Sequence, residues 1–272
     1  WSPDGERTLI LVGSQLHVGD SEGEPQELVG RAFSPFWLTD DIFGYVRLLG
    51  SSAQESLEME LVIRSASSGQ EQLLVKSADL LHQLDSNSMG AFRIMYATVN
   101  PGDPNQLLLA GAPVSGGGKQ FFVIRIQLDS SPDLALPDQE ISKVEAILAL
   151  DDLPIGDSST LTPTGYPPFR LSPNGRWLTV ARFADPITNT WELHLYNVEN
   201  RETKTITFNY PVYPAPFPFY DWSADGNWLL LVDNGFLRLI APDHDYERIV
   251  THDFVACRYP AWVNRDVLGA GA

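Results

Sequence analysis

The chain of 272 residues has one cysteine, few basic residues and no long apolar run. The single cysteine, Cys257, excludes an internal disulfide framework and a zinc cluster built on several cysteine thiolates. No apolar run reaches the roughly 20 residues that a membrane-spanning helix requires, and the first residues lack the pattern of a signal peptide. Because the sequence begins at Trp1, inside a repeated motif, we expect it to be a mature or trimmed portion of a longer chain.

Positive charge is scarce throughout the sequence. The chain has 18 Lys and Arg residues against 35 Asp and Glu residues, which gives a net charge of −17. Nucleic-acid binding requires a basic stripe that neutralises phosphates, and no such stripe is present. The same deficit disfavours contact with an anionic membrane surface. We therefore predict an acidic protein with no nucleic-acid partner and no direct membrane insertion.

A short motif recurs along the chain: an apolar residue, serine, proline or alanine, then Asp-Gly or Asn-Gly, followed by an apolar run. Clear copies start at Trp1, Leu171 and Trp222, and weaker copies occupy residues 33–35, 99–102 and 260–264. Proline favours the first corner of a type I turn, and Asp or Asn followed by Gly tolerates positive φ. Such a pair between two β-rich runs is a strong hairpin signal. A single copy would indicate only an ordinary hairpin, but the recurrence predicts a repeat protein.

The motif resembles the TolB-type propeller repeat, a WD-repeat-like unit. The resemblance rests on Trp1-Ser-Pro-Asp-Gly, Leu171-Ser-Pro-Asn-Gly-Arg-Trp and Trp222-Ser-Ala-Asp-Gly-Asn-Trp, and on the second strands that end in polar turns at residues 195–200 and 239–243. It implies that each unit is a blade, a four-stranded antiparallel sheet whose motif turn joins the innermost strand to the second. A blade cannot bury both faces alone, so five to eight blades pack in a ring. We therefore predict an all-β propeller.

The spacing of the motifs predicts a single propeller domain. Its blades lie near residues 1–32, 33–76, 92–150, 166–208 and 219–250, with a partial blade at 258–272. We favour six blades over five, and the C-terminal segment either closes the ring against the first blade or begins an incomplete sixth. The blades at 33–76 and 92–150 have lost Asp-Gly and carry insertions, where a particular function would reside.

Residues 77–84 are the best helical candidate and read as an insertion between blades. Ser77 can cap this helix and Asp79 lies in its first turn, while Leu80, Leu81 and Leu84 form one apolar face.

The most distinctive candidate for a binding site is the stretch of aromatic residues and prolines at residues 210–219. Its prolines forbid a central strand, so we expect it to run extended along a surface or rim. The stretch presents Tyr210, Tyr213, Phe217 and Phe219. Exposed rings in an extended segment suit a protein or sugar contact with little loss of entropy. The alternative is that these rings pack on neighbouring blades.

Two charged positions extend this candidate rim. Arg170 and Asp221 each lie two residues before the motif serine in adjacent blades, so we predict that they face each other near the channel. A structural ion pair is the favoured interpretation over a catalytic one. The run Asp243-His244-Asp245 resembles a metal-ligand cluster, but its position in a turn predicts a solvated loop. We predict no metal and no cofactor.

The favoured function is a non-catalytic domain that binds a macromolecule or builds an assembly as a structural subunit. Its partner would be a protein or polysaccharide, and its location periplasmic, cell-surface or extracellular. The alternative is a carbohydrate-active or other hydrolytic propeller with acidic residues at the channel mouth. A third possibility is a sensory or regulatory domain of a larger chain. Converging carboxylates with shifted pKa values would favour an enzyme, whereas an aromatic or proline-rich rim would favour binding.

Two enzyme classes fit the sequence poorly. The Asp-box of sialidases separates its Asp and Gly by one residue, whereas Asp4-Gly5 and Asp225-Gly226 are adjacent. A serine peptidase would need a hydrolase domain with a nucleophile elbow, and the chain has no such stretch.

Overall fold

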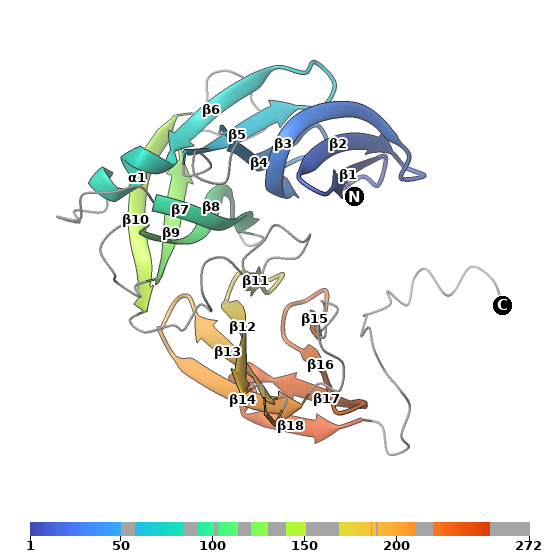
Figure 1. Cartoon of the computed structure of the whole chain (residues 1–272), viewed down its shortest axis with the longest axis vertical. Coiled ribbons are helices and arrows are strands. Elements are labelled where there is room, and N and C mark those ends of the chain that lie inside the picture. The colour runs from blue at the N-terminus through green and yellow to red at the C-terminus, as the bar shows by residue number, and fades with distance from the viewer. Residues whose placement is uncertain are drawn as a thin grey trace. The chain divides into compact units, whose positions relative to one another are not determined.

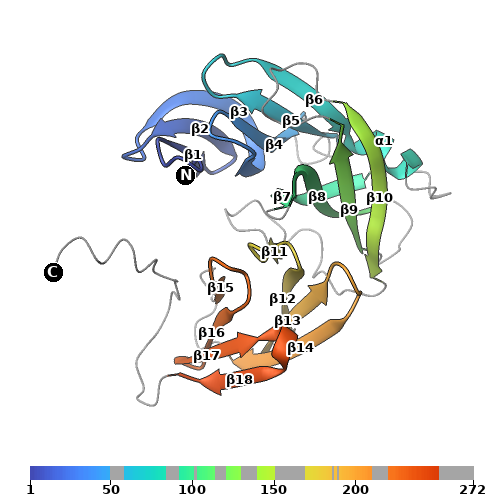
Figure 2. The same cartoon turned by 180° about the vertical axis from the view of Figure 1, so that it is seen from behind.

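The described part of the chain consists almost entirely of antiparallel β-structure. The computed structural model describes residues 1–49, 58–83, 92–100, 103–113, 121–129, 140–150, 169–185, 187–188, 190–209 and 220–250. The chain divides into two compact units, Trp1–Pro167 and Pro168–Ala272, shown from opposite sides in Figures 1 and 2. The all-β class predicted from the sequence is therefore confirmed, while the number of blades and the closure of a ring stay predictions.

The first unit contains two sheets and one helix (Figure 1). The first sheet has six strands in chain order: β1 (Arg7–Val12), β2 (Gln15–Asp20), β3 (Pro25–Trp37), β4 (Ile42–Leu48), β5 (Met59–Ser65) and β6 (Glu71–Lys76). After helix α1 (Ser77–Gln83), the second sheet contains β7 (Phe92–Asn100), β8 (Asp103–Pro113), β9 (Phe121–Leu128) and β10 (Ile141–Leu150). These four strands also form an antiparallel meander, in the order β10-β9-β8-β7.

Strand β3 belongs to both halves of the six-stranded sheet. Its first part pairs with β2, and its last part pairs with β4 from Ala32 to Trp37. The turn predicted at residues 33–35 is therefore wrong: Ser34 has a φ of 49° and forms a bulge inside β3. The Ser-Pro pair lacks the following Asp-Gly that completes the turn elsewhere. The chain turns instead after Leu38, where the Thr39 hydroxyl accepts the backbone N–H of Ile42 at 3.0 Å.

The weaker motif copy at residues 99–102 does mark a hairpin. Asn100 of β7 pairs with Asp103 of β8, so the chain reverses across the two residues between them, which lie outside the described residues. The predicted helix is also present, as α1 packed beside the second sheet (Figure 2). Leu80 is fully buried, and the Ser77 hydroxyl accepts the backbone N–H of Met59 at 3.0 Å. The side chains of residues 81 and 84 lie outside the described part.

The second unit contains two four-stranded antiparallel sheets, each in chain order. One sheet has β11 (Phe169–Leu171), β12 (Trp177–Asp185), β13 (Thr190–Asn197) and β14 (Thr203–Asn209). The other has β15 (Tyr220–Trp222), β16 (Leu229–Asp233), β17 (Phe236–Ala241) and β18 (Tyr246–Ile249), with the short 3-10 helix η1 (Pro242–His244) before β18. Each sheet is a meander of the kind that forms a propeller blade.

Each unit has its own apolar core between sheets. In the first unit one cluster joins β4 and β5 to β7, β8 and β9, and a second fills the face of β4 and β5 that contacts β1–β3. In the second unit Trp177, Leu193, Leu195 and Phe208 of one sheet pack against Trp222 and its neighbours on the other. Within the described residues, no helix combines the length and the apolar character needed to cross a membrane.

Candidate functional site

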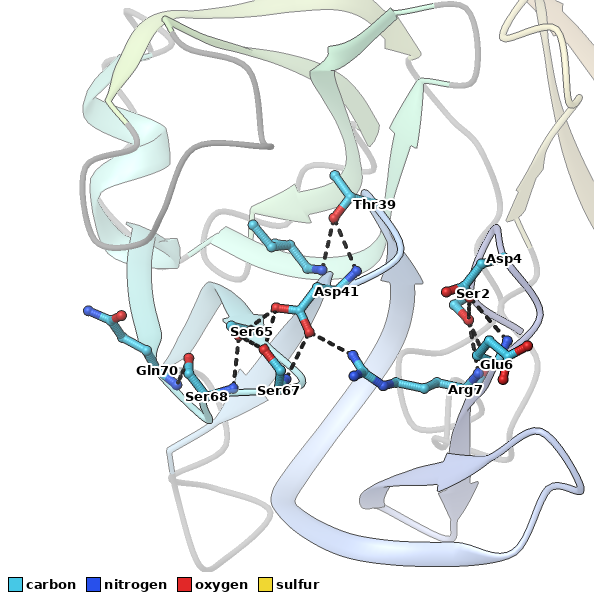
Figure 3. Close-up of polar contacts among 11 residues, drawn as sticks. Ser2, Asp4, Glu6, Arg7, Thr39, Asp41, Ser65, Ser67, Ser68 and Gln70 are labelled. Atoms are coloured by element: carbon cyan, nitrogen blue, oxygen red, sulfur yellow. Dashed lines mark hydrogen bonds and ion pairs between the residues drawn. The ribbon is translucent and has the colours of Figure 1, made fainter.

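The three clear motif copies fold into the same hydrogen-bonded turn. In the first copy, the Ser2 hydroxyl donates to Asp4 Oδ1 at 2.5 Å and accepts the backbone N–H of Arg7 at 3.0 Å (Figure 3). The Glu6 N–H also donates to Asp4 Oδ1, at 3.0 Å. The corresponding bonds recur around Ser172, Asn174 and Trp177, and around Ser223, Asp225 and Trp228, with lengths between 2.5 and 3.1 Å.

Hydrogen bonds fix the protonation state of the two turn aspartates. The Ser2 hydroxyl and the Glu6 N–H lower the pKa of Asp4, and the Ser223 hydroxyl and the Asn227 N–H lower the pKa of Asp225. A general acid needs the opposite shift at neutral pH. These carboxylates therefore hold turns together and are not candidates for acid catalysis.

Asp41 joins three segments of the first unit (Figure 3). Its Oδ1 accepts Arg7 Nη1 at 2.6 Å and the Ser67 N–H at 2.9 Å, and its Oδ2 accepts the hydroxyls of Ser65 at 2.7 Å and Ser67 at 2.9 Å. Burial works against ionisation of this carboxyl. The hydrogen bonds from Ser65, Arg7 and Ser67 outweigh burial and hold the pKa of Asp41 below its ordinary value. Asp41 thus links the first motif turn to the turn between β5 and β6.

A second charged cluster lies on the face of β4–β6. Glu71 accepts the Tyr45 hydroxyl at 2.6 Å, Arg47 Nη1 at 2.8 Å and Arg64 Nη1 at 2.9 Å. Burial disfavours the charged form of Glu71, but these three donors lower its pKa overall. Burial and the neighbouring carboxylate raise the pKa of the Tyr45 hydroxyl. Arg47 also pairs with Glu60 at 3.1 Å, so the cluster is balanced in charge and supports the sheet.

Arg170 and Asp221 face each other, as predicted from their motif positions. Arg170 Nη1 donates to Asp221 Oδ1 at 2.8 Å. Behind this pair, the Thr179 hydroxyl bonds to the Tyr220 hydroxyl and to the Arg170 carbonyl, both at 2.8 Å. The Arg170 side chain is 43% exposed and that of Asp221 is 22% exposed. The pair joins the two sheets of the second unit, and its place near a channel and its part in binding stay predictions.

The run Asp243-His244-Asp245 joins the two sheets of the second unit. Asp243 accepts Arg176 Nη1 at 2.8 Å and the Trp177 indole N–H at 3.1 Å. Asp245 pairs with Lys204, which also donates to the Pro242 carbonyl. Lys204 Nζ lies 5.7 Å from the centre of the Trp177 ring. Across the described ranges, no three His, Cys, Asp or Glu side chains gather as metal ligands would.

The sequence analysis missed this acidic turn as a docking element. The sequence predicted a solvated loop for this run, because the partners Arg176 and Lys204 lie about forty to seventy residues earlier in the chain. A signal was nevertheless present: both Arg176 and Trp177 follow the motif glycine directly. The aromatic candidates Tyr210, Tyr213, Phe217 and Phe219 lie outside the described residues, as does Cys257, so their predicted roles stay predictions.

Among the described residues of the second unit, one sheet face is open where its counterpart on the other sheet is covered. Trp177 and Trp228 occupy the same place after their motif turns, and strand pairing makes Leu195 equivalent to Leu239 and Lys204 to Arg248. Trp177 and Leu195 are buried beneath the sheet β15–β18, whereas Trp228 and Leu239 are only half-buried. The open face also carries Leu230 and Leu237, both half-buried, and the exposed Tyr246, Arg248 and Val250.

The chain matches no protein-family model and no curated protein sequence. Among solved structures it is similar to a protein from Bacteroides uniformis described as a 6-phosphogluconolactonase, with 11% identity, a TM-score of 0.47 and coverage of 94% of this chain and 71% of that one. A protein from Agrobacterium tumefaciens described as TolB gives 12% identity, a TM-score of 0.44 and coverage of 92% and 78%.

A third similar structure is the β-propeller domain of the Trilobed protease from Pyrococcus furiosus, with 9% identity, a TM-score of 0.44 and coverage of 87% of this chain. The chain spans 61% of the length of that protein. Likeness at these identities and TM-scores supports no assignment of family, activity or partner, and the functional argument therefore rests on this chain's own residues.

Proposed function

We propose that the chain is a non-catalytic, propeller-type domain that binds another macromolecule outside the cytoplasm. The observation that carries this proposal is the open face of β15–β18. Within the described residues, this face is defined by the half-buried or exposed side chains of Trp228, Leu230, Leu237, Leu239, Tyr246, Arg248 and Val250. At its edge, Val232 beside Leu237 is fully buried. Aromatic residues and arginine, set among aliphatic side chains, are enriched at protein interfaces and at their energetic hot spots.

The acidic clusters of the described residues support the same proposal. Asp41 and Glu71 each accept several donors, and their pKa values lie below the ordinary range. A glycosidase acid needs a carboxyl whose pKa is raised so that it is protonated near neutral pH. These two carboxylates thus suit the joining of sheets better than proton transfer.

A hydrolytic propeller with acidic residues at a channel mouth is the alternative. The acidic rim loops on which it would depend, including residues 51–55 with Glu55 and 252–257 with Asp253, lie outside the described part of the chain. The alternative therefore predicts carboxylates with raised pKa values there, and an activity that disappears when they are replaced by amides.

The deciding experiment is to isolate the protein, without a tag, from the organism that makes it and to identify what accompanies it. A defined protein or polysaccharide that rebinds the purified domain in a stoichiometric complex would support the proposal. Turnover of glycoside or ester substrates by the purified domain, without such a partner, would overturn it.

A further inference from the structure

We propose that Trp228 and Arg248 form a docking site for an acidic turn, of the type Pro-Asp-X-Asp, presented by a protein partner. This inference rests on the proposed binding function and specifies the site and the chemistry of the partner. It is drawn from a contact that the same chain already makes one sheet earlier, where such a turn is seated on the equivalent residues.

The seated turn is the segment Pro242–Asp245. Its Asp243 carboxylate accepts a hydrogen bond from the Trp177 indole N–H. The Asp245 carboxylate and the Pro242 carbonyl both accept hydrogen bonds from the Lys204 ammonium group. Burial disfavours the charge on Lys204, but the hydrogen bond that it donates to Asp245 and its pairing with Glu202 raise its pKa overall. The indole and the ammonium group thus act together on one acidic turn.

Strand pairing places the same two donor types on the next sheet. Trp228 follows the motif glycine Gly226 by two residues, as Trp177 follows Gly175. On the outer strand, Arg248 pairs with Leu239 as Lys204 pairs with Leu195. The register therefore predicts that Trp228 and Arg248 share one face of the sheet, as Trp177 and Lys204 do.

Within the described part of the second unit, both donors lack a polar partner. Among the described residues, neither the Trp228 indole N–H nor the Arg248 guanidinium takes part in a hydrogen bond or an ion pair. Tyr246 flanks Trp228 edge-on, with ring centres 5.9 Å apart, and is itself 41% exposed. A guanidinium can hold a carboxylate through two parallel bonds, so Arg248 suits an aspartate at least as well as Lys204 does.

One donor of the seated turn has no counterpart. Arg176 binds Asp243 in the existing contact, and Asn227 stands in its place on the open face. The Asn227 side chain is engaged, since its amide donates to Asp225 at 2.9 Å and its carbonyl accepts Asn174 at 3.3 Å. We therefore expect the site to bind an acidic turn with only two anchoring donors, and more weakly than an equivalent contact with three.

The test uses the chain's own docking turn as a probe. The peptide Ala-Pro-Asp-His-Asp-Tyr, the sequence of residues 241–246 with both ends blocked, is titrated into the whole protein. Binding is followed by the indole ¹⁵N–¹H signals, with that of Trp228 assigned by its loss in Trp228→Phe. We expect the Trp228 signal to shift in a saturable way, while the Trp177 signal, whose site is already filled, stays in place.

Two controls decide whether the shift reports the proposed contact. A peptide with asparagine at both aspartate positions should leave the Trp228 signal unmoved. Arg248→Gln should weaken binding of the acidic peptide by about two- to fivefold, the range expected for an exposed ion pair. Arg201→Gln, which changes an exposed arginine in the turn between β13 and β14, should leave binding unchanged. An unmoved Trp228 signal, or equal shifts with both peptides, would overturn the inference.

The two proposals fail in different ways. If a macromolecule isolated with the protein binds Arg248→Gln and Trp228→Phe as tightly as the wild type, the site is wrong and the binding function stands. If no macromolecule binds the domain, the function is wrong whatever the peptide does.

Discussion

The two units make comparable polar contacts with different charges: the first between the two halves of its six-stranded sheet, the second between its two four-stranded sheets. In the first unit Arg7, just after a motif turn, binds Asp41, and Glu27 on the outer part of β3 pairs with Arg64 of β5. In the second unit Trp177, at the same motif position, binds Asp243, and Lys204 on the outer strand pairs with Asp245. The outer-strand charge is negative in one unit and positive in the other.

This difference shows that the register of the motif turn fixes where the contact forms. The charge of the residues that make the contact can differ. The turns at Ser2 and Ser172 each place the residue five positions after the serine next to an acidic group, Asp41 for Arg7 and Asp243 for Trp177. The apolar cores then decide most of the stability, because burial of side chains outweighs partly exposed ion pairs. Variants at equivalent positions can test each part of this comparison.

The largest expected effect is the difference in stability loss between a leucine on the covered face of β11–β14 and its counterpart on the open face of β15–β18. Leu195→Ala removes a fully buried side chain and should lower the free energy of unfolding by about 2–5 kcal/mol. Leu239→Ala, at the equivalent but half-buried position, should lower it by only about 1–2 kcal/mol. Urea titrations followed by fluorescence measure both. Equal losses would show that the face of β15–β18 is covered as fully as that of β11–β14.

Next in size is the contact between motif turns. Gly5 and Gly226 both have positive φ, 78° and 69°, so alanine at either position incurs about 1–2 kcal/mol of left-handed strain. A Cβ at Gly5 would meet nothing within 4 Å, whereas one at Gly226 would lie 2.6 Å from the Asn174 backbone nitrogen. Gly226→Ala should therefore lose about 1–3 kcal/mol more than Gly5→Ala in the same titrations. Equal losses in stability would contradict the close approach of the turns that contain Asn174 and Gly226.

Several of these features could be predicted from the sequence because they are local. The motif residues specify their own turn, since serine and Asp or Asn supply its side-chain hydrogen bonds within five residues and glycine adopts its positive φ. The pairing of Arg170 with Asp221 followed from the same register, because two copies of one motif place equivalent residues alike. Where the motif is incomplete, at Ser34-Pro35, the prediction failed, because the bulge depends on the bonds of Ser34 to the Ala97 backbone in another sheet.

The docking of Asp243 could not be predicted in the same way. Its partners Arg176 and Trp177 lie far from it in sequence, and only the packing of one sheet on the next brings them together. A run of two aspartates and a histidine carries no information about which cation it meets. The same limit applies to the pairing of Arg7 with Asp41, which spans two sheet regions.

The contacts of Asp41 and Lys204 should lose their contributions to the free energy of unfolding at opposite ends of the pH scale. The pKa of Asp41 is lowered, so its contribution to stability is present above its ordinary value of 3.8 and is lost as the pH falls through the lowered value. The pKa of Lys204 is raised, so its contribution is present below 10.5 and is lost as the pH rises through the raised value. Asp41→Asn should lose about 1 kcal/mol at neutral pH, and its deficit should shrink in acid.

Lys204→Gln is the matched variant, and its deficit should be present at neutral pH and shrink in alkali. Thermal or urea unfolding, measured as the pH is lowered from neutrality into acid and raised from neutrality into alkali, gives the two curves. A deficit of either variant that is constant across this range would mean that the charge does not stabilise the join.

The smallest effect concerns the two ion pairs within the join of the second unit. Asp243 is 20% exposed and is bound by Arg176 and the Trp177 indole, whereas Asp245 is 86% exposed. Solvent screens exposed pairs, so a double-mutant cycle on Lys204 and Asp245 should give a coupling of about 0–0.5 kcal/mol. The cycle on Arg176 and Asp243 should give about 0.5–1 kcal/mol, because the Asp243 carboxylate is held in fixed geometry. A larger coupling for Lys204 and Asp245 than for Arg176 and Asp243 would show that the exposed ion pair contributes more to this contact. Arg248, rather than Trp228, would then be the principal anchor on the equivalent open face.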